Sequence, residues 1–247
     1  AGPVSSIRTE MSSPPAVARR EFVKLSLAAG ATASLGLSAP AVAQQPKTLR
    51  FGHMLPVDSI YHKAIALFAD EVGKLSGKKI KVDIFPSSQL GNISEMMQSV
   101  QAGSLTMSMA VPAWYSNFMK PVDAFTLPYM VSSVDKLQPA LEGKIGSEIS
   151  RLGEAAGFRV FGYWLMGGRH IVNKVRPVNV PDDCKGLKIR VINSQVYMAA
   201  FRALGANPVA MDPSELYLAL QQGVVDGFEY PLPDLVSYKL YEVAKFL

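Results

Sequence analysis

The chain has 247 residues, of which 49% are hydrophobic and 18% charged, and its formal net charge is +5. This composition excludes intrinsic disorder of the whole chain, and the single cysteine excludes a disulfide scaffold and a four-thiolate zinc site. The basic residues are spread along the sequence without a long run, so we expect no nucleic-acid partner. The length fits one large domain or two small ones.

Residues 1–43 have the three-part layout of a secretory signal peptide. The pair Arg19-Arg20 precedes an apolar run over 25–37, and small residues at 41–43 form a cleavage pattern. The run is too short for a membrane span, which needs ~20 residues, and two glycines and a proline oppose the alternative of a packed helix. The twin arginines predict export by the twin-arginine route to the periplasm, leaving a mature protein that does not span the membrane.

The first part of the mature chain alternates between strand and helix patterns. Period-two alternation predicts strands at 47–52 and 79–85, and a third strand is expected at 105–111. Helical spacing predicts one helix from Ser59 to Gly77 and another from Ser94 to Gly103. This order favours a parallel sheet with helices on both faces.

The later part repeats the same kinds of element. The predicted strands and extended segments are 158–164, 170–172, 187–191, 208–211 and 224–228, and the predicted helices are 196–204 and 213–222. We therefore expect two α/β halves. Lobe I takes residues 44–125, and residues 126–247 form mainly lobe II together with strands that cross between the lobes.

No sequence pattern points to catalysis. Glycine-rich nucleotide loops and a nucleophile elbow are absent from the sequence, and its three histidines show no metal-ligand spacing with Cys184. A nucleophilic Cys184 and a metal site at Asp182-Asp183 are weaker interpretations than a buried thiol and a turn. The sequence therefore predicts a protein without a cofactor or a metal, and not an enzyme.

Three stretches carry a family resemblance. They read FPSSQLG at 85–91, GLKIRV at 186–191 and MDPSELYLALQQGVVDGFE at 211–229. In this order and spacing, behind an export signal, they resemble the DctP-type solute-binding proteins of tripartite ATP-independent periplasmic (TRAP) transporters. The resemblance runs from about residue 48 to residue 247.

The resemblance implies an α/β, two-lobed periplasmic binding protein fold with a ligand cleft between the lobes. Such proteins close around an organic acid by a hinge motion and deliver it to the TRAP permease membrane subunits, with transport driven by an ion gradient. Family members extend further, so we expect that the C-terminal part of the fold is missing from this chain.

The resemblance also implies site residues. Arg190 occupies the position of the carboxylate clamp, Arg169 that of a second cleft arginine, and Asn193 that of a cleft-lining asparagine. From alternation alone, Arg190 lies on the opposite face from Leu187, Ile189 and Val191, and a solvated position is the alternative. For Arg169 the alternative is a loop arginine paired with a structural acid. A guanidinium fork suits a carboxylate better than lysine does.

One difference between this sequence and the family pattern bears on the kind of ligand. Members that bind sialic acid or C4-dicarboxylates commonly read DGxENP where this chain reads DGFEYP at 226–231. We expect Glu229, Tyr230 and Trp114 to line the cleft, which favours a monocarboxylate with an apolar or aromatic tail, such as a 2-oxo or 2-hydroxy acid, over a sugar acid or a short dicarboxylate. The alternative for Trp114 is a place in the core.

The sequence therefore predicts a periplasmic solute-binding protein that captures a carboxylate. A periplasmic sensing subunit that binds the same ligand for a signalling system is an alternative that the sequence does not separate. A secreted enzyme of the same architecture is a third possibility, without catalytic residues to support it.

Overall fold

The computed structural model describes residues 45–130 and 133–247. The signal peptide and twin-arginine pair predicted within residues 1–43 lie outside the described part. Residues 45–247 form a single compact unit, and the division into lobes at residue 125 stays a prediction.

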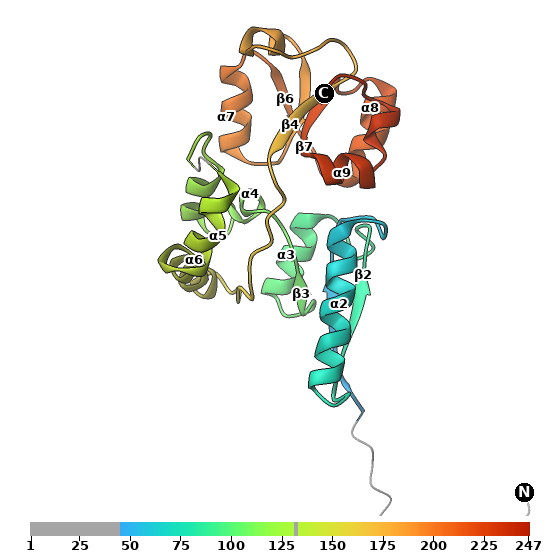
Figure 1. The fold of residues 1–247 in the computed structure, drawn as a ribbon, viewed down its shortest axis with the longest axis vertical. Helices are drawn as coiled ribbons and strands as arrows, with labels where there is room; N and C mark the ends of the chain where they lie inside the picture. The colour runs from blue at the N-terminus through green and yellow to red at the C-terminus, as the bar shows by residue number, and fades with distance from the viewer. Residues whose placement is uncertain (1–44, 131–132) are drawn as a thin grey trace, which may run out of the picture. The chain divides into compact units, whose positions relative to one another are not determined.

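The first sheet is parallel, as its strand–helix order predicts (Figure 1). Strand β1 (Lys47–Gly52) lies between β2 (Ile80–Phe85) and β3 (Met107–Ser108). Helices α2 (Ile60–Leu75) and α3 (Ile93–Gln101) connect the strands, so each crossover is a helix, as a parallel pair requires.

Local capping determines where these two helices begin. The Ser59 hydroxyl caps α2 by accepting from the N–H of Tyr61, as predicted. Helix α3 begins earlier than the expected Ser94, because Asn92 and Glu95 form a reciprocal capping box with distances of 3.0 and 2.8 Å.

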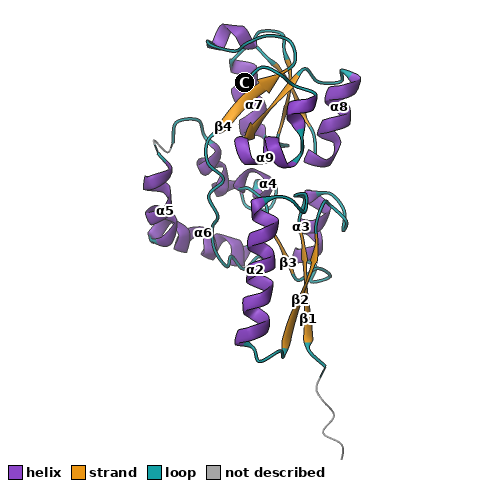
Figure 2. Cartoon of the chain, turned by 45° about the vertical axis from the view of Figure 1, so that its right-hand side comes forward, coloured by secondary structure: helices purple, strands orange, loops and turns teal. Residues whose placement is uncertain are grey.

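The second sheet has the strand order β4-β7-β5-β6. Its strands are drawn in orange in Figure 2, where β4 is labelled. Strand β5 (Lys188–Val191) runs parallel to both β6 (Asn207–Ala210) and β7 (Gly227–Pro231), and β4 (Arg169–Asn173) is antiparallel to β7. Helix α7 (Gln195–Ala203) connects β5 to β6. This order places β7 and β5, which carry two of the resemblance motifs, side by side.

The remaining helices have between 4 and 12 residues. They are α4 (Pro112–Tyr115), α5 (Val134–Glu142), α6 (Lys144–Ala155), α8 (Leu216–Gln222), which follows a 3₁₀ turn at Pro213–Glu215, and α9 (Leu232–Ser237). Further 3₁₀ turns lie at Lys120–Thr126, Pro181–Cys184 and Leu240–Glu242. Helix α8 and its stop at Gly223, whose φ is +76°, agree with the sequence prediction.

Three predicted strands differ from the structure. Residues 158–164 form no strand, because no described strand lies beside them to share a ladder of hydrogen bonds. The strand expected at 105–111 is limited to β3, and it does not continue past Ser108 because its partner β1 ends at the opposite residue, Gly52. Strand β7 begins at Gly227 rather than at 224, since the preceding residues turn back toward α8.

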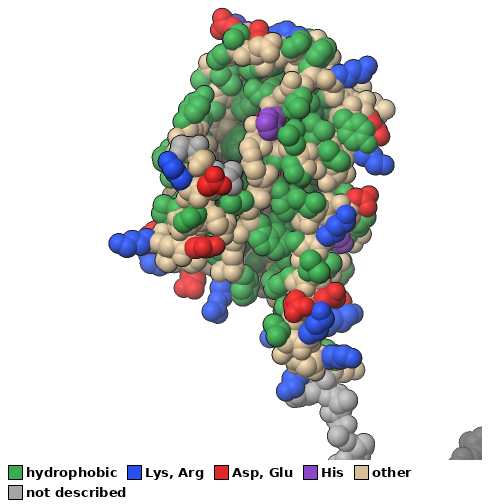
Figure 3. Space-filling model, in the orientation of Figure 1, with side chains coloured by type: hydrophobic (Ala, Val, Ile, Leu, Met, Phe, Trp, Pro, Cys, Tyr) green, Lys and Arg blue, Asp and Glu red, His purple; other side chains and the backbone are tan. Residues whose placement is uncertain are grey.

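Each sheet has an apolar core of its own. Phe51, Ile65 and Val82 are buried between the first sheet and α2, and the second sheet has buried clusters on both faces. The face in Figure 3 carries many apolar side chains among scattered charges. Among the described residues, no helix is long and apolar enough to cross a membrane.

Candidate functional site

Arg190 is a buried cation on the central strand pair of the second sheet. It lies on β5 opposite Phe228 of β7 and is 1% exposed, so the alternative of a solvated face is wrong. Its Nε and Nη2 donate to the Met211 carbonyl at 2.9 and 2.7 Å. The third nitrogen, Nη1, is buried and has no hydrogen-bond partner. A charged donor is thus held in place by two bonds while one edge of its fork stays free.

Arg169, at the start of β4, is paired with Glu229 of β7. Its Nε and Nη2 contact the two carboxylate oxygens, with Nη2 to Oε1 at 3.0 Å, and Nη2 also donates to the Glu229 carbonyl at 3.2 Å. Burial lowers the pKa of Arg169, but the charge of Glu229, the hydrogen bond to its carboxylate and the neighbouring tyrosines together raise the pKa overall. The alternative of an arginine paired with an acid of the fold is therefore what the structure shows, and its ligand contact stays a prediction.

Tyr230 joins the two arginines. Its ring centroid lies 5.3 Å from Cζ of Arg190 and 5.5 Å from Cζ of Arg169, both within cation–π range. The ring of Tyr197 lies 5.8 Å from Cζ of Arg169. Burial raises the pKa of Tyr230 to about 12, so the phenol stays neutral. The ring therefore supports both guanidinium groups within one buried cluster.

The structure thus brings together four of the six predicted site residues. The other two lie differently: Trp114 is buried in a core cluster with Met54 and Ile192, as its alternative interpretation has it, and Asn193 is exposed just after β5. The roles of all six toward a ligand stay predictions.

Sequence reasoning missed Asp234. This residue lies in the first turn of α9, is 0% exposed, and neither carboxylate oxygen has a hydrogen-bond partner. Burial raises its pKa to about 6, against the opposing effect of Arg169. The only sequence signal was an acid four residues after Tyr230, and acids are common in first helical turns for reasons of capping alone.

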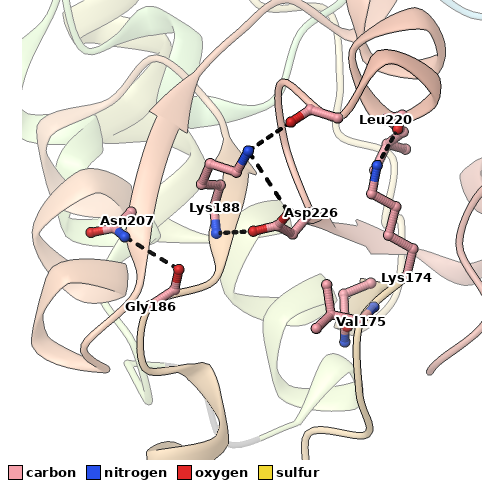
Figure 4. Close-up of polar contacts among 9 residues, drawn as sticks. Lys174, Val175, Gly186, Lys188, Asn207, Leu220 and Asp226 are labelled. Carbon is pink, nitrogen blue, oxygen red and sulfur yellow. Dashed lines mark hydrogen bonds and ion pairs between the residues drawn. The ribbon is translucent and has the colours of Figure 1, made fainter.

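The resemblance motifs also contain residues that hold the fold together (Figure 4). The Asp226 carboxylate accepts from the backbone N–H of Lys188 at 2.8 Å, and Lys188 Nζ donates to the Gly223 carbonyl at 2.6 Å. Lys174 Nζ donates to the Leu220 carbonyl at 2.6 Å. Two lysines therefore bind carbonyls at the C-terminus of α8, where the helix dipole favours positive charge.

No described cluster suits a metal, because no three His, Cys, Asp or Glu side chains gather in residues 45–130 and 133–247. A groove of about 460 Å³ lies along α6 and the segment 160–163, lined by Gly146, Ser150 and Tyr163 among others. None of the six predicted site residues lines this groove.

Residues 51–247 match the family described as bacterial extracellular solute-binding protein, family 7. The chain belongs to this family. The resemblance to DctP-type TRAP solute-binding proteins is thereby confirmed.

Two curated relatives illustrate the match. The 2,3-diketo-L-gulonate-binding periplasmic protein YiaO of Escherichia coli strain K12 is 33% identical over 201 residues, covering 81% of this chain and 61% of the relative. The C4-dicarboxylate-binding periplasmic protein DctP of Rhodobacter capsulatus is 35% identical over 218 residues, covering 87% and 65%. The chain thus spans less than two thirds of the length of these relatives.

Solved structures agree on the α/β fold. The sugar acid binding protein DctPAm from Advenella mimigardefordensis strain DPN7T, in complex with galactonate, gives a TM-score of 0.80 at 34% identity, covering 82% of this chain and 65% of that one. A TRAP periplasmic solute binding protein from Sulfurospirillum deleyianum DSM 6946, with bound succinate, gives 0.77 at 33% identity, covering 80% and 64%.

Proposed function

We propose that this protein is a periplasmic solute-binding protein that captures an organic acid through its carboxylate and delivers it to a TRAP membrane permease. The observation that carries the proposal is Nη1 of Arg190, a charged donor that is buried without a partner. Leaving such a group unpaired is costly, and an incoming carboxylate oxygen removes that cost.

The surroundings of Arg190 support an anionic ligand. The Arg169–Glu229 pair is close to neutral in sum, and the tyrosine between the arginines is uncharged, so the charge of Arg190 is not balanced by a carboxylate bonded to it. The Met211 carbonyl fixes the guanidinium plane, which prepares it for binding and lowers the entropy cost of capture.

The named ligands of the relatives have one group in common. Diketogulonate, C4-dicarboxylates, galactonate and succinate differ in size and hydroxylation, but all carry a carboxylate. We infer the same ligand group for this chain, held without catalysis and without a cofactor. The apolar or aromatic tail predicted from Tyr230 and Trp114 is a separate proposal, and buried Trp114 adds little to it.

Export by the twin-arginine route belongs to the same proposal. It is supported by the Arg19-Arg20 pair and by the periplasmic relatives. N-terminal sequencing of periplasmic material tests it, with a mature start at Gln44 expected.

The test of carboxylate capture is calorimetry with a panel of acids. Arg190→Lys keeps the charge but loses the fork, so we expect it to weaken binding of any acid by about 30-fold or more, which corresponds to ~2 kcal/mol. Arg202→Lys, on the exposed face of α7, is the matched control and is expected to bind like the wild type. Unchanged affinity in Arg190→Lys would mean that the clamp is assigned to the wrong residue.

A further inference from the structure

Two buried groups of opposite charge lack hydrogen-bond partners in the part of the fold around Tyr230. One is Nη1 of Arg190, the donor described above; the other is the carboxylate of Asp234, whose two oxygens are both unpaired. Asp234 follows Tyr230 by four residues across the β7–α9 junction, and Arg190 packs on the Tyr230 ring.

The groups near Asp234 do not pair with it. Tyr238 follows Asp234 by one helical turn, with its N–H donating to the Asp234 carbonyl at 2.9 Å, and its ring centroid lies 6.0 Å from that of Tyr230, so α9 holds Asp234 close to this tyrosine pair. Burial raises the pKa of Tyr61, Tyr230 and Tyr238, and the charge of Asp234 raises each of them further. The Tyr238 hydroxyl instead donates to the Met54 carbonyl at 2.8 Å, and Arg169 is engaged by Glu229.

An unpaired carboxylate at 0% exposure is costly to a folded protein. The neighbouring residues Leu235 and Tyr238 contact the hydrophobic cluster that contains Tyr230 and Leu240, so the surroundings are apolar. A donor that arrives with the ligand removes the cost for Asp234, as the ligand carboxylate does for Arg190.

We propose that Asp234 accepts a hydrogen bond from a hydroxyl next to the ligand carboxylate, so that the site selects 2-hydroxy acids over the corresponding 2-oxo acids. This inference rests on the proposed carboxylate capture by Arg190. It adds a second ligand group, the 2-hydroxyl, and the residue that binds it, Asp234.

The selectivity follows from the hydrogen-bonding inventory of the two ligands. An ionised carboxylate only accepts, so it pairs with a hydroxyl, whereas a keto oxygen also only accepts. A 2-oxo acid would leave Asp234 unpaired and place the keto oxygen, which also only accepts, next to the carboxylate. Sites built to bond a hydroxyl discriminate strongly against analogues that lack it, so we expect a preference of about tenfold or more.

The experiment compares matched ligand pairs by calorimetry at pH 7.5. The probes are 2-hydroxy-4-methylpentanoate, 2-hydroxy-3-phenylpropanoate, 2-hydroxysuccinate and galactonate, each beside its 2-oxo counterpart. We expect at least one skeleton to bind with the hydroxy form preferred. Asp234→Asn keeps the size and offers an N–H donor, so it should reduce that preference to about twofold or less by improving the 2-oxo acid. Asp182→Asn changes an exposed side chain, so this control variant should keep the wild-type preference for the hydroxy acid.

The outcomes separate this inference from the proposed function. Binding of acids with equal affinity for the two forms in the wild type overturns the role of Asp234 and leaves carboxylate capture intact. The same holds if Asp234→Asn keeps the wild-type preference, or if 2-amino acids bind more tightly than 2-hydroxy acids. Absence of binding by every acid overturns both. The wild-type comparison needs no variant, so poor folding of Asp234→Asn does not prevent the test.

Discussion

The Arg169–Glu229 pair differs from the other arginine–glutamate pair of the described chain in its burial. Its side chains are 24% and 4% exposed, whereas those of Arg151 and Glu148 on α6 are 66% and 56% exposed. Burial makes the loss of one partner expensive, because the remaining charge has no water to solvate it.

Glu229→Gln should therefore destabilise the protein by ~3 kcal/mol, because it leaves the Arg169 charge uncompensated. Urea unfolding measures this loss. The matched control is Glu148→Gln, in which water replaces the lost partner and no measurable change is expected. Equal effects of the two substitutions would show that the Arg169–Glu229 pair is not held in a buried site.

At the scale of the elements, the close contact between β4 and β7 depends on a residue without a side chain. A Cβ atom on Gly227 would lie 2.5 Å from both the Cβ of Asn173 and the carbonyl oxygen of Val172. Backbone atoms cannot move away cheaply, so the two strands would separate. Since β4 and β7 carry Arg169 and Glu229, this spacing also positions the candidate site.

Gly227→Ala should cost ~3 kcal/mol in the free energy of unfolding and weaken acid binding as well. Thermal and urea unfolding test this. Gly73, inside α2, has no atom near the position of an added Cβ, so Gly73→Ala should instead stabilise by ~0.5–1 kcal/mol through helix propensity. A neutral Gly227→Ala would contradict the close approach of the two strands.

The Asp226 carboxylate ties the loop after α8 to the start of β5. Asp226→Ala removes the acceptor for the Lys188 N–H and should cost about 1–2 kcal/mol, whereas Asp226→Asn retains an acceptor oxygen and should cost less. Chemical denaturation of the two variants distinguishes a hydrogen bond from a charge effect. Equal losses in the two would indicate that the charge is what matters.

At the scale of the whole molecule, two buried groups make the free energy of unfolding depend on pH in opposite directions. Burial raises the pKa of Asp234 from 3.8 to about 6, so the folded state binds its proton more tightly and stability falls as pH rises through this window. Burial lowers the pKa of His53 from 6.5 to about 4, so stability is lost as pH falls through that window. Each effect amounts to ~3 kcal/mol.

Because the two windows overlap, the ligand-free protein should have a nearly flat stability profile between about pH 4 and 6. Asp234→Asn should reveal the His53 effect, with the melting temperature falling as pH is lowered. His53→Gln should reveal the Asp234 effect, with the melting temperature falling as pH is raised. The tyrosines around Asp234 stay neutral throughout, since their pKa values are raised. Parallel profiles in the two variants would contradict this assignment.

Burial, and after it the neighbouring His62, lower the pKa of His53, and the hydrogen bonds of its ring act in the same direction. Its Nδ1 accepts from the Leu55 N–H at 3.2 Å, so the proton of the neutral ring is on Nε2, which lies 3.1 Å from Nδ1 of His62. A second proton on His53 would need Nδ1, and the Leu55 bond would be lost. This geometry supports the sign of the His53 effect.

Local patterns in the sequence were sufficient to predict most strands and helices and to recognise the family. Alternation over 47–52, the cap at Ser59 and the stop at Gly223 depend on neighbouring residues only, so they were predictable. Residues 158–164 have the composition of a strand, but a strand also needs a neighbour, and that depends on contacts distant in sequence. The family resemblance of the GLKIRV stretch predicted Arg190 as a cleft residue. The alternation of apolar and polar residues in that stretch was also compatible with a solvated arginine, and the structure shows that Arg190 is buried.

The sequence by itself determined the family and the positions of most strands and helices, and through the resemblance it pointed to Arg169 and Arg190. Only the tertiary structure decided that Arg169 is paired with Glu229, that Arg190 keeps one free buried donor, and that Asp234 is unpaired near the same tyrosine. The physical reason is that burial and hydrogen-bond satisfaction depend on which strands lie side by side. An isolated stretch of sequence carries its own alternation and caps, but not the groups that reach it from elsewhere in the chain.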